Sequence, residues 1–276
     1  CNMNLLTVEG ISKSFGDKKI FDDITFGIDE GDRIGLIGIN GTGKSTLLKI
    51  VAGNESADSG QIVKKNGLRI GYLPQTPDFD PEDTVLGQVF NCDSPVINLI
   101  KEYEQAVREV ELTGSEESQK ALYALNDKMD AADAWNIESD AKTILTKLNI
   151  PDFYKKAGTL SGGQLKRMAL ARALITPVDL LILDEPTNHI DNDSVEWLEK
   201  YLAKYKGALL MVTHDRYFLD RIVNKTLELD EAKLYSYTTN YSGFLEAKAE
   251  REELAAAAER KRRNFLRTEI EWVRRG

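Results

Sequence analysis

A glycine-rich stretch at residues 38–46 has the residue types that hold phosphate groups in nucleotide sites. It fits the pattern G-x-x-x-x-G-K-[ST], in which glycines let backbone N–H groups approach phosphate oxygens and a lysine supplies a cation to the β- and γ-phosphates. The hydroxyl that follows the lysine is a ligand for Mg²⁺. The predicted nucleotide-binding residues are Gly38, Ile39, Asn40, Gly41, Thr42, Gly43, Lys44, Ser45 and Thr46, with Ser45 also ligating the metal.

Two adjacent acidic residues, Asp184 and Glu185, follow the apolar run at 180–183. A carboxylate at the end of a buried strand needs a charged partner, and Mg²⁺ beside a nucleotide is the natural one for Asp184. Glu185 comes next along the strand, so we expect its side chain to point the other way, toward the γ-phosphate. There it would act as the catalytic base that polarises the attacking water.

Between these motifs lies the sequence Leu-Ser-Gly-Gly-Gln at 160–164, which opens a predicted helix over 164–174. A helix N-terminus attracts an anion for the same reason as the phosphate loop does. The order of the three motifs resembles the ABC ATPase superfamily. This resemblance implies an α/β fold of the P-loop NTPase class, with a mixed sheet core, an antiparallel β subdomain and an inserted helical subdomain. It also implies ATP and Mg²⁺ as ligands.

The same resemblance implies that this chain carries half of each of two sites. In ABC proteins the Ser-Gly-Gly segment caps the nucleotide held by a different nucleotide-binding domain, so catalysis needs two such domains. We therefore expect a second ABC domain, either later in a longer chain or in a homodimer mate. By resemblance, the residues that act on the opposing domain's ATP are Ser161, Gly162, Gly163 and Gln164.

Three further residues receive roles only through the resemblance. His214 occupies the place of the switch histidine, a catalytic residue that contacts the γ-phosphate. Gln75 matches a glutamine that contacts Mg²⁺ and water, and Phe15 matches an aromatic that stacks on adenine. Taken without the resemblance, a lone histidine is usually structural, Gln75 is an ordinary loop residue and Phe15 is equally compatible with a core position.

A finer resemblance concerns the ABC-F group, whose members have two nucleotide-binding domains and no membrane domain. It is carried by Thr-Asn-His-Ile-Asp at 187–191, by Asn-Tyr-Ser-Gly-Phe at 240–244 and by Glu-Trp-Val-Arg-Arg-Gly at 271–276. The last of these is similar to the linker of the Uup and EttA types. ABC-F proteins are ribosome-associated ATPases, so the resemblance implies binding near the ribosomal tRNA exit site. The basic stretch at 260–263 is chemically suited to RNA phosphates, although it also fits a solvated helix face.

Two other classes stay open at this point. The first is the ATPase subunit of a transporter, coupled to a separate membrane protein through the groove near Gln75. The second is an ABC ATPase associated with DNA repair or with a scaffold. The motif at 187–191 and the charged C-terminal helix favour the ribosome-associated class.

The elements that position these residues follow from apolar periodicity. Residues 5–36 and 61–73 predict strands, with the buried strand 33–37 running into the phosphate loop and a helix over 44–52. Between about 84 and 158 the sequence turns helix-forming and charged, with 12 acidic and 6 basic residues over 93–147. From 178 to 235, buried strands alternate with helical segments, which predicts a parallel sheet covered on both faces.

These patterns divide the chain into two parts. We assign 3–243 to an ABC ATP-binding domain with a helical subdomain inserted at about 84–175, and 244–276 to the start of a charged interdomain linker helix. Residues 256–276 carry seven basic and three acidic side chains, and a helix this polar has little core to face. We expect it to project or to bridge domains, and we expect the chain to be the N-terminal portion of a longer protein.

Composition narrows the class further. The net charge of −9 argues against binding nucleic acid over the whole surface, although it leaves local basic patches possible. No apolar run reaches the ~18–20 residues of a membrane-spanning helix. The two cysteines, Cys1 and Cys92, are too few for a disulfide framework, which suits a reducing cytoplasm.

Overall fold

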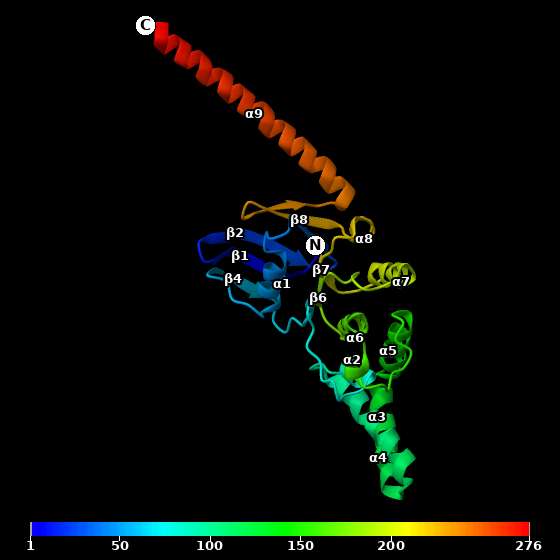
Figure 1. Ribbon diagram of the computed structural model, residues 1–276. Helices are drawn as coiled ribbons and strands as arrows, with labels where there is room; N and C mark the ends of the chain where they lie inside the picture. Colours follow the sequence, from blue (N-terminus) through cyan, green and yellow to red (C-terminus); the bar gives the residue numbers. More distant parts are fainter. Residues whose placement is uncertain (1, 276) are drawn as a thin grey trace.

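A mixed β-sheet lies at the centre of the protein, and helical projections extend from opposite ends of it (Figure 1). The structure, a computed structural model, describes residues 2–275. Expectations that involve Cys1 or Gly276 lie outside the described residues. The α/β fold predicted from the sequence is confirmed, with a mixed main sheet, an antiparallel sheet, a helical region and an added C-terminal helix.

The main sheet has the strand order β5-β6-β7-β3-β8-β9. The first five strands run parallel, and β9 closes the edge in the antiparallel direction. The strands are β3 Arg33–Ile37, β5 Ile70–Leu73, β6 Leu180–Asp184, β7 Ala208–Val212, β8 Lys225–Asp230 and β9 Lys233–Tyr237.

The central strands are apolar at every position because both of their faces are covered. On β6, Leu180 and Ile182 pack into the core on the side of the N-terminal strands, whereas Leu181 and Leu183 pack on the helical side. This alternation follows from the two-residue period of a strand. Asp184 ends the run, so a carboxylate stands where the buried strand stops.

A second sheet, antiparallel and in the order β2-β1-β4, covers one side of the main sheet. Its strands are β1 Asn4–Phe15, β2 Lys18–Asp29 and β4 Ser59–Lys64. Helix α1, Lys44–Ala52, lies between the two layers and buries Leu47, Leu48, Ile50 and Val51. The helix therefore holds the phosphate loop at its N-terminus through packing on both sides.

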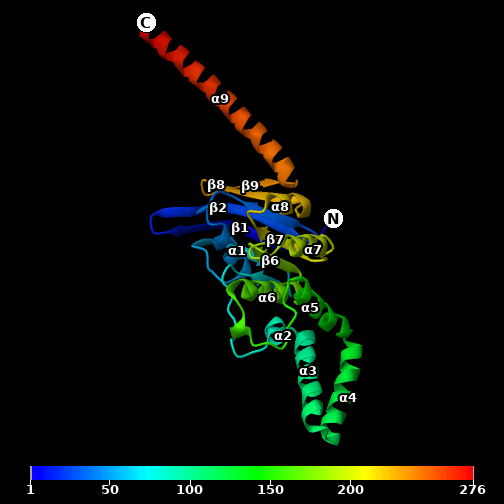
Figure 2. The ribbon, with the colours of Figure 1, turned by 45° about the vertical axis from the view of Figure 1, so that its right-hand side comes forward.

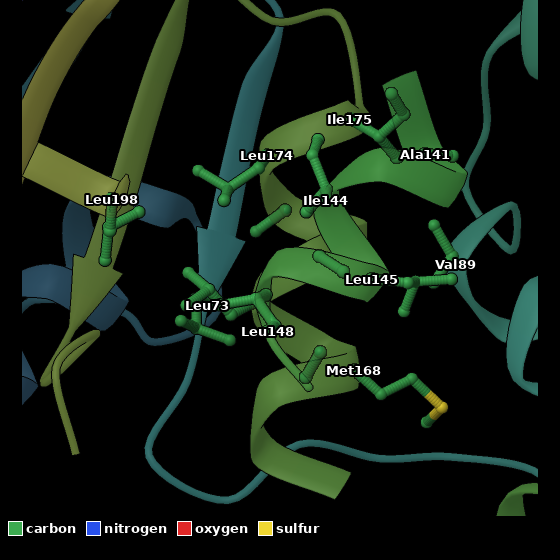
Figure 3. Packing of buried hydrophobic residues seen from close by; sticks show 14 of the residues in the cluster. Leu73, Val89, Ala141, Ile144, Leu145, Leu148, Met168, Leu174, Ile175 and Leu198 are labelled. Carbon is green, nitrogen blue, oxygen red and sulfur yellow. The ribbon is translucent and has the colours of Figure 1, made fainter. Parts of the chain in front are cut away.

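Helices α5 and α6 form the packed base of the helical region, where Leu145 and Leu148 lie beside Met168 and Leu174 (Figure 3). The helices of this region are α2 Val85–Val89, α3 Pro95–Thr113, α4 Glu116–Ala131, α5 Trp135–Lys147 and α6 Gly162–Ile175, with a 3₁₀ turn at Ala157–Thr159. Helices α3 and α4 form a hairpin that points away from the sheet (Figure 2). At the root of this hairpin, the rings of Tyr103 and Trp135 pack edge to face, with their centroids 4.9 Å apart.

The C-terminal third returns to the main sheet and then leaves it. Helix α7, Asn192–Ala203, and helix α8, Arg216–Ile222, cover the sheet next to β7. Helix α9, Tyr241–Arg275, starts against the β8–β9 edge and extends into solvent (Figure 1). Its first turns are fixed by Phe244, which is buried, and by Arg251, which pairs with Glu228 on β8. Within residues 2–275, none of the helices combines the length and the apolar content that crossing a membrane requires.

Candidate nucleotide site and its surroundings

The phosphate loop leaves the carboxyl end of β3 and turns into α1. Two of its glycines cannot be replaced without a collision. A Cβ at Gly38 would lie 2.7 Å from Thr42 Oγ1 and 2.8 Å from the Leu229 carbonyl oxygen, and Gly43, at φ 91°, faces the Ile20 side chain. The loop therefore packs backbone directly against β8 and β2, with the first N–H groups of α1 free to bind an anion.

Lys44 lies over this loop, where its ammonium donates hydrogen bonds to the carbonyl oxygens of Gly38 and Ile39. Burial lowers the pKa of Lys44, while the Glu185 and Asp184 carboxylates act in the opposite direction. A half-buried cation that faces two acids beside a helix N-terminus suits a polyphosphate that carries its own metal.

Asp184 is the buried acid of the site, at 3% exposure. Neither of its carboxylate oxygens has a hydrogen-bond partner within 3.5 Å among residues 2–275. Burial raises the pKa of Asp184, and the nearby Ser45 hydroxyl opposes that shift. An orphaned buried carboxylate fits a divalent cation, and the neighbouring Ser45 at the start of α1 supplies the hydroxyl that such a site needs. Within the described part of the chain, residues 2–275, no group of three or more His, Cys, Asp or Glu side chains is arranged to hold a metal ion by itself. Mg²⁺ in nucleotide sites keeps only one or two protein ligands and takes the rest from phosphate and water.

Glu185 differs from the prediction in its backbone. It was expected to continue the strand, but the strand ends at Asp184 and Glu185 turns away with a φ of 52°, in the left-handed region. Its N–H still donates to the Val212 carbonyl of β7 at 2.7 Å, which fixes the turn. The strand alternation therefore does not set the direction of the Glu185 side chain; the turn does.

The turn brings Glu185 to His214, which follows β7. Glu185 Oε2 accepts the His214 backbone N–H at 3.2 Å, and Glu185 Oε1 lies 3.1 Å from His214 Nε2. Burial raises the pKa of Glu185, and the neighbouring histidine opposes that shift. The two residues predicted to be catalytic thus form one pair at the carboxyl edge of the sheet.

The signature segment lies at the N-terminus of α6. The Ser161 hydroxyl accepts the Gln164 N–H at 3.2 Å, and Gln164 Oε1 accepts the Ser161 N–H at 2.9 Å, which forms a capping box. Ser161 and Gly162 are exposed, so the cap presents backbone N–H groups to the outside. Its predicted role toward the nucleotide of another domain stays a prediction.

The remaining predicted residues lie on the rim. Gln75 follows β5 and lines a cavity of about 220 Å³ together with Asp184, Glu185 and Lys166. Phe15 ends β1 with its ring half exposed, and Lys13 Nζ lies 5.4 Å from the ring centroid. An exposed aromatic ring is available for stacking, and its predicted role toward adenine stays a prediction.

Sequence reasoning missed three residues that the fold brings to the site, namely Lys18, Thr213 and Tyr72. Lys18 Nζ donates to the Gly41 carbonyl at 3.3 Å, and Thr213 Oγ1 lies 3.0 Å from Thr187 Oγ1, joining the two loops after β7 and β6. The Tyr72 hydroxyl is buried, and burial with the nearby Asp184 charge raises its pKa to about 12. Lys18 stood in an ordinary turn sequence and Tyr72 in an ordinary strand, so neither carried a local signal.

Comparison with known proteins gives the family. The family described as "ABC transporter" matches residues 21–188, and a second family with the same description matches 227–276. An uncharacterized ABC transporter ATP-binding protein of Bacillus subtilis, YfmR, is 50% identical over 275 residues, which are 99% of this chain and 44% of that protein. Energy-dependent translational throttle protein EttA is 38% identical in Mycobacterium tuberculosis and 37% identical in Escherichia coli K12, over 99% and 98% of this chain. The chain spans about half the length of these relatives.

Solved structures agree on the fold. An ATP-binding subunit of an ABC transporter superposes with a TM-score of 0.62 at 21% identity, covering 85% of this chain and 90% of that one. A dimeric ATP-binding cassette bound to ADP and Pi in a post-hydrolysis state also gives 0.62, at 20% identity, covering 85% and 98%. An archaeal ribosome recycling factor in complex with a ribosomal stalk protein gives 0.60 at 23% identity, covering 84% of this chain and 39% of that one.

Proposed function

Because this chain belongs to the ABC transporter ATP-binding family, whose domains bind ATP, we propose that it binds and hydrolyses ATP as one half of an ABC-F type pair that acts on the ribosome in the cytoplasm. ATP would close this domain against a second ABC domain. Glu185 would then drive hydrolysis, and the pair would reopen.

The observation that carries the ATPase part is the meeting of Lys44, Asp184, Glu185 and His214 at the carboxyl edge of one parallel sheet. Lys44 and the N–H groups of α1 bind and orient the β- and γ-phosphates. Ser45 and Asp184 would hold Mg²⁺, which would supply positive charge beside the phosphates. Burial makes the Glu185 carboxylate more basic, and His214 holds it by two contacts, so Glu185 can accept the proton of an attacking water.

The ribosomal part is supported by the relatives and by the shape of the chain. EttA is named as a translational throttle protein and aligns with 98–99% of this chain. The motif at 187–191, which resembles the ABC-F group, and the long α9, whose C-terminal part is basic, belong to the same chain. We propose that the α3–α4 hairpin is an arm and that α9 begins an interdomain linker, since they project from opposite ends of the core (Figure 1). The linker would approach tRNA.

The test uses the full-length protein carrying Glu185→Gln. This variant removes the base and keeps the shape of the side chain, so we expect ATP binding to be retained and turnover to stop at the site that contains Lys44 and Asp184. The closed state should then accumulate and sediment with ribosomes in ATP but not in ADP. Normal turnover in Glu185→Gln would remove Glu185 as the base.

Two outcomes would redirect the proposal. Co-purification of the variant with a membrane permease, in place of ribosomes, would favour a transporter ATPase. Preference for branched DNA over ribosomes at matched salt would favour the DNA-associated class.

A further inference from the structure

The loop that follows Glu185 is held in a backbone conformation that non-glycine residues seldom adopt. Its two ends, Glu185 and His189, have φ values of 52° and 64°. A left-handed backbone is unfavourable for a residue other than glycine, and such positions persist where surrounding contacts enforce them. His189 is therefore held in this conformation by its contacts.

One end of this loop is fixed to the catalytic core. The Glu185 N–H donates to Val212 at 2.7 Å, and Thr187 Oγ1 lies 3.0 Å from Thr213 Oγ1, next to His214. Any movement of residues 185–187 is thus transmitted to the Glu185–His214 pair.

The other end is fixed to the helical region. Lys166 Nζ of α6 lies 3.2 Å from His189 Nε2. A lysine ammonium only donates, so Nε2 is the acceptor and the imidazole proton is on Nδ1. Gly163 faces the same side chain, since a Cβ placed there would lie 3.6 Å from the Cβ of His189. The contact is therefore one helical turn from the Ser161 cap.

We propose that His189 is a positioning residue that ties the signature segment, Ser161–Gln164, to the loop carrying Glu185. The inference rests on the proposed function and names a part of it. Through His189, the cap that this domain lends to the opposing ATP keeps a set distance from its own hydrolytic acid. Lys166 and His189 sit at the domain surface, where a bond of this kind adds little stability. Its effect is therefore on geometry, and turnover should change without a change in melting temperature.

The experiment compares two amides at position 189 in the full-length protein. The side-chain oxygen of a glutamine lies nearly as far from the backbone as His189 Nε2 and can accept from Lys166, whereas an asparagine side chain is too short to reach Lys166. Asn, however, tolerates the left-handed backbone better than Gln does. The proposed bond predicts that His189→Gln keeps kcat near wild type and that His189→Asn loses about tenfold, within the range that a small misplacement can cost. Backbone strain alone predicts the reverse order.

Two further variants complete the test. Lys166→Met should lose kcat as His189→Asn does, and the double variant should lose no more than either single one, with KM for ATP within about twofold throughout. Lys200→Met, which breaks an exposed ion pair with Glu196 on α7, is the matched control and should leave kcat unchanged.

Wild-type turnover in His189→Asn, or a loss in it that Lys166→Met does not share, would overturn the positioning role and leave the ATPase proposal intact. A wild-type protein without ATPase activity would overturn both.

Discussion

The two acids at the end of β6 are adjacent in the sequence and differ in their surroundings. Asp184 is enclosed with no hydrogen-bond partner among residues 2–275, whereas Glu185 is held by the His214 backbone and imidazole. Burial raises the pKa of both. The Asp184 carboxylate, which lacks a partner, is suited to bind a cation. The Glu185 carboxylate, which its neighbours orient, is suited to act on water, so the two adjacent acids support different roles.

Replacing Lys44 should lower ATP affinity more directly than replacing any other residue of the site. Lys44→Ala removes the cation that faces the phosphates, and a charge-assisted contact of this kind is worth about 3 kcal/mol. We therefore expect ATP affinity to fall about 100-fold, measured with a fluorescent ATP analogue. Lys19→Ala, which breaks an exposed ion pair with Asp22 beyond the loop, should bind within about twofold of wild type. Unchanged affinity in Lys44→Ala would contradict the assignment of the phosphate site.

Residues with local patterns were predictable, and residues brought in by the fold were not. The phosphate loop and the helix over 44–52 follow from glycine spacing and apolar periodicity, and α1 has those bounds. Glu185 was placed on a strand because the alternation was extended past Asp184. Pro186, which follows Glu185, cannot donate to a strand ladder and does signal that the strand ends here, but it does not predict the left-handed φ of Glu185. Thr187 and Thr213 are 26 residues apart, so their contact depends on the pairing of β6 with β7.

At the scale of elements, the root of the α3–α4 hairpin contains an acid pair that sequence patterns did not reveal. Lys142 Nζ lies 2.7 Å from Glu138 and 3.7 Å from Glu104. Burial and the neighbouring Glu138 carboxylate raise the pKa of Glu104 to about 7. Two carboxylates share one lysine here, so one of them holds its proton near neutral pH.

This arrangement predicts a pH-dependent stability. A carboxyl whose pKa is raised in the folded state binds its proton more tightly when folded. Its contribution is therefore fully present below the unfolded value of 4.5 and is lost as the pH rises through about 7. Glu104→Gln mimics the protonated form, so at pH 5 it should melt near wild type, and at pH 8 it should be more stable by about 1–2 kcal/mol. Glu102→Gln, an exposed change on the same helix, should show no such pH dependence in the thermal melts.

The start of α9 is held by a buried acid on the sheet. Glu228 is 2% exposed and accepts Arg251 Nη2 at 3.0 Å and Lys248 Nζ at 2.8 Å. The Arg251 guanidinium also lies 4.0 Å from the centroid of the Tyr235 ring. The sequence predicted a projecting linker helix over 244–276, but it did not reveal that Glu228 anchors this helix, because a single acid in an apolar strand has no partner in the local sequence.

Removing one partner of this cluster should loosen the helix. Arg251→Met leaves part of the Glu228 charge unpaired, and we expect a loss of about 1–3 kcal/mol in urea unfolding, less than for a fully buried pair since Arg251 is partly exposed. Hydrogen exchange should rise in residues 241–252. Arg263→Met breaks an exposed pair with Glu259 on the same helix and should cost under about 0.5 kcal/mol. Equal effects of the two variants would show that Glu228 does not anchor α9.

At the scale of the whole molecule, the two projections carry opposite charge. Residues 95–131 of the hairpin contain eight acidic and four basic side chains, while residues 256–276 contain three acidic and seven basic ones. The chain thus has a net negative charge although residues 256–276 are basic. A polyanion would meet repulsion at the hairpin and attraction at α9, which places any contact with RNA phosphates at α9.

The basic stretch at 260–263 has a geometry that sequence alone does not convey. Four consecutive helical residues point about 100° apart, so these side chains surround α9 and do not form one face. Arg262 and Arg263 pair with Glu259, whereas Arg260 and Lys261 form no ion pair among residues 2–275. A ring of this kind suits a helix with nucleic acid on more than one side.

Reversing all four charges to Glu in the full-length protein should weaken its association with ribosomes if these residues contact phosphate. Each phosphate contact contributes about 0.7–0.9 to the slope of log K against log salt, so the slope should fall by up to about 3. The loss is therefore larger at 50 mM salt than at 200 mM, on the order of tenfold or more at the lower concentration, as measured by co-sedimentation across a salt series. The control reverses four exposed lysines of the core, Lys200, Lys204, Lys206 and Lys233, which changes the net charge equally. If the control lost as much affinity with the same salt dependence, total charge would explain the effect; if neither variant lost affinity, α9 would be only a solvated helix at this point.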